Sequence, residues 1–253
     1  MIITIDGPAG SGKSTIAVRL KEIFENEDLK REKESKNKKD IKKYNFEVLD
    51  TGAIFRSFNI YLTEKFKKID LLPEDIEKKE NLKYKEELIE LLDNIDLKIL
   101  DKNGKKIYLL FGEDITKDLR DPNKMKNISK ISASKIIREK ILEIEKAYAE
   151  DKNIIVEGRD TGTVVFPKAE FKFYLDSDIK ERALRRYLQE EKESNFNVEK
   201  YEKVLEDLKI RDEKDKTREV APLKIPEGAI IIDNTKDTID DTALKMIKEI
   251  LKN

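Results

Sequence analysis

The sequence predicts an α/β fold in which helices cover both faces of a mostly parallel five-stranded sheet, giving three layers. Three observations support this fold class. Short apolar runs rich in isoleucine and valine alternate with helical patterns along the chain. A glycine-rich segment, residues 7–12, follows the first apolar run and opens a helical pattern. Two further β-type runs flank Asn103 and Gly104, a strong short signal for a hairpin, which predicts a small antiparallel insertion.

Each predicted element follows from its local pattern. The strands of the parallel sheet are expected where short β-branched runs end at polar or glycine residues. These runs are 2–5, 46–49, 153–156, 171–175 and 229–232. Helical spacing of apolar residues predicts helices at 14–24, 53–66, 84–92, 128–150, 179–192 and 240–252. The two remaining β runs, 97–100 and 107–111, are predicted to pair as the antiparallel hairpin.

The domain organisation follows from these elements. We expect a core made of residues 1–66 and 123–253, interrupted by a small subdomain at 67–122. Within the core, residues 25–45 hold eight basic and six acidic side chains with almost nothing apolar, which predicts a charged insertion. A solvated extension is the preferred interpretation of this segment, and a partner-binding tail is the alternative.

Composition excludes several kinds of chemistry. The 253 residues include no cysteine and no histidine, which excludes disulfides, thiolate chemistry and the commonest general base. Lysine and arginine number 53 against 54 acidic residues, so a net charge of −1 gives no general attraction to nucleic acid or an anionic membrane. No apolar run approaches the ~20 residues that span a bilayer, and no leader pattern is evident, so we expect a soluble cytoplasmic protein.

The glycine-rich segment fits the pattern G-x-x-x-x-G-K-[ST], in the required position between a strand and a helix. Backbone amides of such a loop surround phosphates, the lysine reaches the β- and γ-phosphates, and the hydroxyl after it binds Mg²⁺. The sequence therefore predicts binding of ATP with Mg²⁺, with Ser14 as metal ligand. The predicted nucleotide-binding residues are Gly7, Pro8, Ala9, Gly10, Ser11, Gly12, Lys13, Ser14 and Thr15.

Other nucleotide-binding classes fit the sequence less well. A GTPase would need N-K-x-D, whereas residues 234–237 read Asn-Thr-Lys-Asp in the wrong order. A motor ATPase would need a longer chain and an apolar Walker B strand with two acidic residues, and neither is evident. A kinase for another small acceptor such as UMP, a nucleotide-dependent switch, and a nucleic-acid-binding protein acting through residues 25–45 remain as alternatives.

Five further segments carry a family resemblance. They are residues 49–56 (LDTGAIFR), 129–139, 157–167 (EGRDTGTVVFP), 181–186 (ERALRR) and 211–223 (RDEKDKTREVAPL). With the glycine-rich loop, they resemble the bacterial cytidylate (CMP) kinases, in order along the chain apart from residues 25–45. The resemblance implies a P-loop kinase fold that binds the acceptor nucleotide through subdomain 67–122 and carries a helical lid at about 178–196. It also implies transfer of the γ-phosphoryl group of ATP to CMP or dCMP.

The resemblance implies roles for single residues in acceptor binding. Arg56, Arg159 and Arg218 match positions that hold the acceptor phosphate, where guanidinium groups can bind bidentately. Asp160 and Ser129 would accept from the cytosine amino group, while Arg138 would donate to the ring acceptors. For these residues the alternatives are surface or structural ion pairs, and a helix N-cap for Ser129. Arg211 and Asp215 match residues that contact the sugar, and Asp50 and Thr51 match the acceptor-side loop.

The resemblance also implies how catalysis occurs. The lid arginines would stabilise charge on the transferring phosphoryl group, although a solvated helix face is the alternative. The implied catalytic residues are Lys13, Arg159, Arg182, Arg185 and Arg186. The nucleophile is already an anionic phosphate oxygen, so no base is needed. Two departures stand out: Phe55 replaces a common tyrosine, and Glu157 replaces a usual aspartate. We expect a monomer with small-molecule substrates and neither nucleic-acid nor membrane partners.

Overall fold

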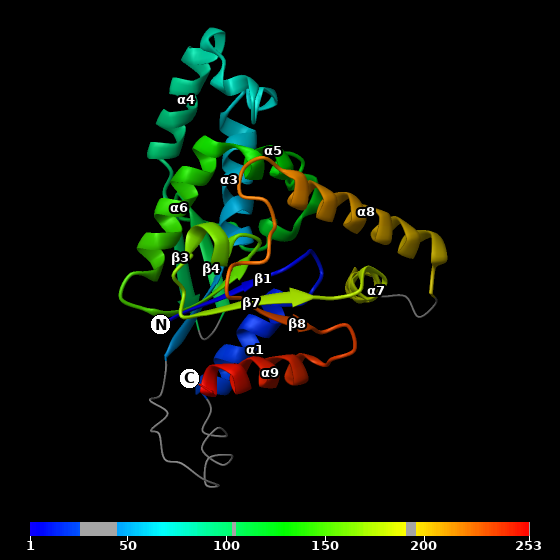
Figure 1. Cartoon of the computed structure of the whole chain (residues 1–253). Helices are drawn as coiled ribbons and strands as arrows, with labels where there is room; N and C mark the ends of the chain where they lie inside the picture. The colour runs from blue at the N-terminus through cyan, green and yellow to red at the C-terminus, as the bar shows by residue number, and fades with distance from the viewer. Residues whose placement is uncertain (26–44, 103–104, 191–195, 253) are drawn as a thin grey trace. The chain divides into compact units, whose positions relative to one another are not determined.

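The structure is a computed structural model that describes residues 1–25, 45–102, 105–190 and 196–252 (Figure 1). It forms two compact units, one made of Met1–Asp50 with Ala149–Asn253 and the other of Thr51–Tyr148. The predicted subdomain at 67–122 lies wholly within the second unit. Parts of three predicted features fall outside the described residues. They are most of the charged insertion, Asn103 and Gly104 of the hairpin, and residues 191–195 of the lid.

The first unit is built on a parallel sheet of five strands in the order β2-β6-β1-β7-β8. Every predicted strand is present, and each runs one or two residues further at its carboxyl end. The fold class is therefore confirmed as α/β with a parallel five-stranded sheet. The strands are β1 Ile2–Asp6, β2 Phe46–Asp50, β6 Asn153–Gly158, β7 Phe171–Asp176 and β8 Ile230–Asp233.

Two helices cover one face of this sheet, α1 Lys13–Glu25 and α9 Ile239–Leu251, which lie side by side in Figure 1. Strand side chains alternate between faces, so Ile3 and Ile5 enter the core beneath these helices. Phe24 of α1 and Met246 of α9 belong to the same buried cluster. This burial positions the amino end of α1, which follows the glycine-rich loop.

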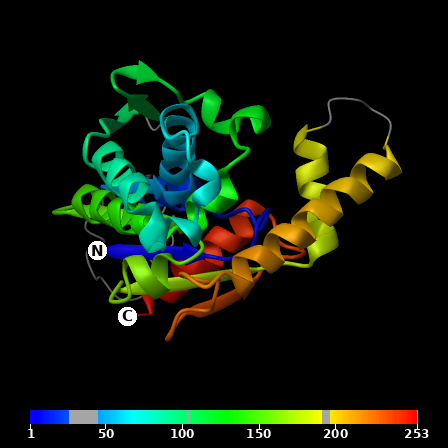
Figure 2. The same cartoon turned by 90° about the horizontal axis from the view of Figure 1, so that it is seen from above.

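A helical pair forms the other large part of the first unit. It consists of α7 Ile179–Glu190 and α8 Val198–Thr217, which pack against each other (Figure 2). Helix α7 was predicted and α8 was not. The sequence feature that could have indicated α8 is its N-cap residue, Asn197. The Asn197 side chain accepts a hydrogen bond from Lys200 N at 3.0 Å. A single helical turn, η6 Thr161–Val165, follows β6.

The second unit combines helices with the predicted small antiparallel sheet. Strands β3 Leu97–Lys102, β4 Lys105–Leu110 and β5 Glu113–Asp114 pair in that order, so the sheet has one more strand than predicted. The main helices are α3 Thr51–Lys65, α4 Leu82–Asp93, α5 Ile128–Ala133 and α6 Lys135–Ala149. Short 3₁₀ turns are η1 Ile69–Leu71, η2 Asp75–Glu77, η3 Lys79–Asn81, η4 Asp118–Arg120 and η5 Pro122–Lys124.

The prediction of one helix over 128–150 was wrong. Ser134 has an extended backbone, with φ −72° and ψ 122°, and separates α5 from α6. Its carbonyl accepts the first bond of α6, from Arg138 N at 3.0 Å. Serine competes with the helix for local hydrogen bonds and favours such boundaries over helix interiors.

Among the residues described, no helix combines the length and apolar character needed to cross a bilayer.

Candidate active site

Acidic residues end the strands of the parallel sheet at one edge. Asp6 and Asp50 are the last residues of β1 and β2, and β6 ends in Glu157 and Gly158. Register places Asp50 beside Glu157 and Asp6 beside Gly158. Ligands of open parallel sheets bind outside the carboxyl ends of the strands. The first unit therefore gathers its polar groups where such a site is expected.

The glycine-rich loop connects β1 to α1, so the predicted context of strand, loop and helix is confirmed. Gly10 has φ +76°, in the left-handed region that favours glycine. A Cβ atom on Gly7 would lie 2.3 Å from the Leu175 carbonyl oxygen of β7. Only glycine allows the loop to pass this close to the neighbouring strand, which gives the loop its compact shape.

Lys13 is buried inside the curve of this loop, with 5% of its surface exposed. Its Nζ donates to Pro8 O at 2.7 Å and to Ser11 Oγ at 3.3 Å. Burial lowers the pKa of Lys13 to about 7, and repulsion from Arg159 and Arg211 adds to this shift. Cations gathered around a backbone loop in this way form a site for a polyanion.

Ser14 and Glu157 form a candidate cation site beside Lys13. Ser14 Oγ donates to Glu157 Oε1 at 2.5 Å. Burial raises the pKa of Glu157 to about 7, and the neighbouring Asp50 carboxylate adds to the increase. A hydroxyl and two carboxylates are the oxygen donors that Mg²⁺ prefers. Within the described ranges, no group of three or more acidic side chains is arranged to hold a metal ion.

Asp6 supports the turn that follows β6. Its Oδ1 accepts from Thr161 N and Thr161 Oγ1, both at 2.9 Å, and its Oδ2 accepts from Gly162 N at 2.8 Å. These bonds fix the turn directly after Arg159 and Asp160. Burial is the largest effect on Asp6 and raises its pKa. Sequence reasoning missed this role, although an acidic residue ending a strand before the loop was a visible signal.

Most predicted acceptor residues of the first unit form ion pairs with one another. Arg159 Nε donates to Asp215 Oδ2 at 2.9 Å. Arg218 NH2 lies 3.4 Å from Asp160 Oδ1. Arg211 is exposed, yet its charge lowers the pKa of Lys13, where burial is the largest effect. Arg159 and Arg211 thus lie close enough to Lys13 to lower its pKa after burial, and Arg159 and Arg218 are each paired with a carboxylate.

The second unit places other predicted residues close to one another. Arg138 on α6 donates through NH1 to Ser132 O at 2.9 Å, and its guanidinium lies 5.0 Å from the centre of the Phe55 ring. Ser132 Oγ in turn donates to Ser129 O at 3.2 Å. Ser129 is the second residue of α5, so it is not the N-cap. The contact between Arg138 and Phe55 was not predicted. Thr51 and Arg56 both lie on α3.

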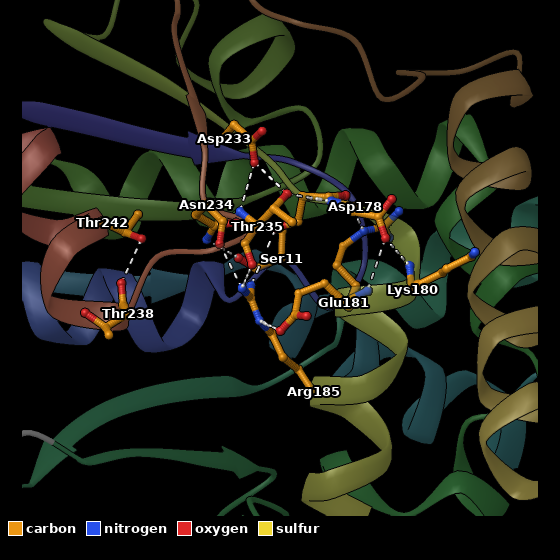
Figure 3. A network of polar contacts seen from close by, with 12 residues as sticks. Ser11, Asp178, Lys180, Glu181, Arg185, Asp233, Asn234, Thr235, Thr238 and Thr242 are labelled. Atoms are coloured by element: carbon orange, nitrogen blue, oxygen red, sulfur yellow. Dashed lines mark hydrogen bonds and ion pairs between the residues drawn. The ribbon is translucent and has the colours of Figure 1, made fainter. Parts of the chain in front are cut away.

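The three arginines of α7 differ in their surroundings. Arg185 NH2 donates to Asn234 O at 2.8 Å and to Thr235 O at 2.9 Å, beyond the end of β8 (Figure 3). Asn234 Nδ2 donates to Ser11 O at 2.9 Å, so this network continues into the glycine-rich loop (Figure 3). Arg186 is exposed, whereas Arg182 is buried. The three predicted arginines therefore have three different environments in this structure.

A family model and relatives found by sequence point to the same family. A family model described as cytidylate kinase matches residues 33–252. "Cytidylate kinase" from Caldicellulosiruptor saccharolyticus is 37% identical over 250 residues, covering 99% of this chain and 95% of that protein. "Cytidylate kinase" from Caldanaerobacter subterraneus is 36% identical over 251 residues, covering 99% and 95%. The protein of the same name from Fusobacterium nucleatum is 38% identical over 252 residues, covering 100% and 98%.

Proposed function

This chain belongs to the cytidylate kinase family, as its motifs predicted, and from that premise we propose that it transfers the γ-phosphoryl group of ATP to CMP or dCMP. The products are ADP with CDP or dCDP, so the enzyme is a nucleoside monophosphate kinase of pyrimidine nucleotide metabolism. The observation that carries the proposal is the environment of Lys13, a buried ammonium group that donates to Pro8 O inside the glycine-rich loop. Burial lowers its pKa most, and the charges of Arg159 and Arg211 lower it further.

The glycine-rich loop binds ATP in this proposal. Its backbone amides and the amino end of α1 face the phosphates, which bring about four negative charges. Lys13 Nζ exchanges Pro8 O for oxygens of the β- and γ-phosphates. The phosphates restore the charge of the lysine, because a neighbouring anion favours the protonated amine.

Ser14, Glu157 and Asp50 suit the Mg²⁺ that accompanies ATP. Ser14 would supply a hydroxyl ligand, and the carboxylates would orient the ion or its waters. When bound, the ion neutralises phosphate charge. The direct contact between Ser14 and Glu157 supports this assignment, because it places a hydroxyl and a carboxylate oxygen side by side.

The acceptor phosphate oxygen attacks the γ-phosphorus, while the bond to the β–γ bridging oxygen breaks and ADP leaves with the electron pair. No proton has to be removed from the nucleophile, which fits a chain without histidine. Arg56, Arg159 and Arg218 hold the acceptor phosphate in line for this attack. Arg185 and Arg186 stabilise the charge that develops on the transferred group.

Base recognition depends on hydrogen-bonding pattern. The cytosine amino group donates to Asp160 and Ser129, and the ring acceptors receive from Arg138. Uracil would instead set its O4 lone pairs against the Asp160 carboxylate, which is 5% exposed. Because a buried mismatch of this kind is costly, UMP should be a poor acceptor. Arg211 and Asp215 contact the sugar in this proposal. Asp50 and Thr51 belong to the loop on the acceptor side.

An acceptor comparison tests this function. ADP release is measured at fixed MgATP with CMP, dCMP, UMP, GMP and TMP in turn. We expect CMP and dCMP to accelerate release strongly and the others to do so weakly. A nucleotide switch would hydrolyse ATP slowly whichever acceptor is added, and a UMP kinase would prefer UMP. Either result would contradict the proposal.

Several expectations stay predictions. They concern the cytoplasmic location, the monomeric state, the absence of nucleic-acid and membrane partners, and the boundaries of subdomain 67–122 and of the lid. Deleting residues 26–44 and measuring activity would show whether the charged segment contributes to catalysis.

A further inference from the structure

The family resemblance assigns Arg182 to the lid, where its guanidinium would bind phosphate. In this structure the guanidinium instead bonds to groups of the protein. Its guanidinium is buried, with 6% of the side chain exposed. NH1 donates to Ala9 O at 2.7 Å, in the middle of the glycine-rich loop, and Nε donates to Ser177 O at 3.1 Å. Arg182 therefore bonds to the backbone of the loop that is expected to bind the nucleotide phosphates.

Asp212 on α8 completes this arrangement. Its Oδ2 lies 2.7 Å from Arg182 NH1, and its Oδ1 accepts from Ala9 N at 3.2 Å. One ion pair thus satisfies both backbone groups of a single loop residue. The Ala9 amide is committed to Asp212, so the phosphates have to be bound by the other amides of the loop. No motif assigned a role to Asp212.

Apolar packing fixes the same residue. The Ala9 methyl group lies in a small buried cluster with Ala183 of α7 and Leu208 of α8. The next residue, Gly10, passes so close to α7 that an added Cβ would lie 3.4 Å from both Cβ and O of Arg182. Hydrogen bonds and packing therefore both join the loop to the α7–α8 pair.

We propose that Arg182 and Asp212 are positioning residues, which set the phosphate-binding shape of the glycine-rich loop by holding Ala9 against α7 and α8. Removing either partner would leave a buried charge and a buried backbone group without a partner, which is costly. The loop would then relax, and nucleotide binding would weaken. This inference takes from the proposed function only the assumption that the loop binds an adenine nucleotide.

ADP binding distinguishes this role from a contact with the γ-phosphate, because ADP lacks that phosphate. The variants are Arg182→Lys, Asp212→Asn and the double variant, and ADP affinity is measured by calorimetry with Mg²⁺ present. We expect each single variant to bind ADP about tenfold more weakly, the scale of one lost charge-assisted hydrogen bond. The double variant should be no weaker than the weaker single variant, because the two residues act as one unit.

A matched control is Asp207→Asn, which removes the same charge from an exposed site on α8 and should leave ADP affinity unchanged. ADP binding needs no acceptor, so the test is decided whether or not CMP is the substrate. If folded Arg182→Lys and Asp212→Asn bind ADP like the unmodified protein while turnover falls, Arg182 acts on the γ-phosphate and the proposal is wrong.

A second measurement covers variants that fail to fold. In the nucleotide-free unmodified protein, hydrogen exchange at the Ala9 amide is followed by NMR. The bond to Asp212 should make this amide exchange at least about tenfold more slowly than the amide of exposed Gly10. Equal exchange at the two amides would overturn the proposal.

Discussion

Ser14 Oγ donates a hydrogen bond to Glu157 Oε1 over 2.5 Å, which joins the first turn of α1 to the carboxyl end of β6. A hydroxyl directly after the glycine-rich loop thus contacts a buried carboxylate. The family resemblance leads us to expect aspartate at position 157, and the extra methylene group of glutamate does not prevent this contact. The same carboxylate favours the charged form of Lys13.

Replacing Lys13 should abolish most of the activity and keep the fold. Lys13→Ala and Lys13→Met, which retains the apolar stem, should both lower kcat by about 10²–10³-fold because a phosphate donor is lost. Stability should not fall in Lys13→Met, since burial disfavours the ammonium group. Steady-state kinetics and thermal melting check both points. Lys248→Ala, an exposed change on α9, is the control, and retained turnover in Lys13→Ala would refute the assigned role.

Stability should depend on pH through Glu157. Between pH 4.5 and about 7 the folded protein keeps a proton on Glu157 that the unfolded chain has lost. The free energy of unfolding therefore falls as pH rises through this window, by roughly 3 kcal/mol from this group. Glutamine cannot be protonated in this range, so Glu157→Gln removes this loss of stability. The free energy of unfolding of the variant should therefore rise relative to that of the unmodified protein as pH rises, and the difference should become constant above about pH 7.

Urea denaturation of the nucleotide-free protein at several pH values measures this difference. Glu227→Gln, at an exposed position, should show no such trend. A stability difference for Glu157→Gln that stays constant across the window would show that the carboxyl group titrates normally.

Asp160→Asn should relax the choice of base. The amide can present a donor to uracil O4, where the carboxylate cannot. We expect kcat/KM for CMP to fall by about 10²–10³-fold, with a much smaller loss for UMP, so that the ratio between them narrows. Asp151→Asn, on the exposed turn before β6, is the control. An unchanged ratio in a folded variant would remove Asp160 from base recognition.

Phe55 should help to orient Arg138, because the guanidinium lies over its ring at 5.0 Å. Phe55→Leu should raise KM for CMP by about three- to fivefold, the scale of one cation–π contact, with little change in kcat. Phe55→Tyr keeps the ring and should retain the original KM or lower it. If leucine and phenylalanine give the same KM, the ring has no part in binding.

The strands of the parallel sheet could be predicted because strands buried on both faces leave a continuous apolar run in the sequence. The glycine-rich loop could be predicted because its chemistry demands fixed residues at fixed spacing. Helix α8 was missed because its charged surface hides the weak apolar pattern. The break at Ser134 was missed because apolar spacing continues across it.

The family resemblance proposes a set of site residues, but it does not give the contacts that hold them. Asp212 is 203 residues away from Ala9, so no local pattern links them. The roles of Asp6 and of the Arg185 network likewise depend on tertiary pairing. The family resemblance named the charged residues proposed for the site, whereas their hydrogen-bond and ion-pair partners became clear only in three dimensions.

The most direct test is a crystal structure with a non-hydrolysable ATP analogue and CMP bound together. We expect Lys13 Nζ to lie within hydrogen-bond distance of the β- and γ-phosphates and the cytosine amino group to contact Asp160. A triphosphate bound away from Lys13, or a cytosine that does not contact Asp160, would contradict this expectation.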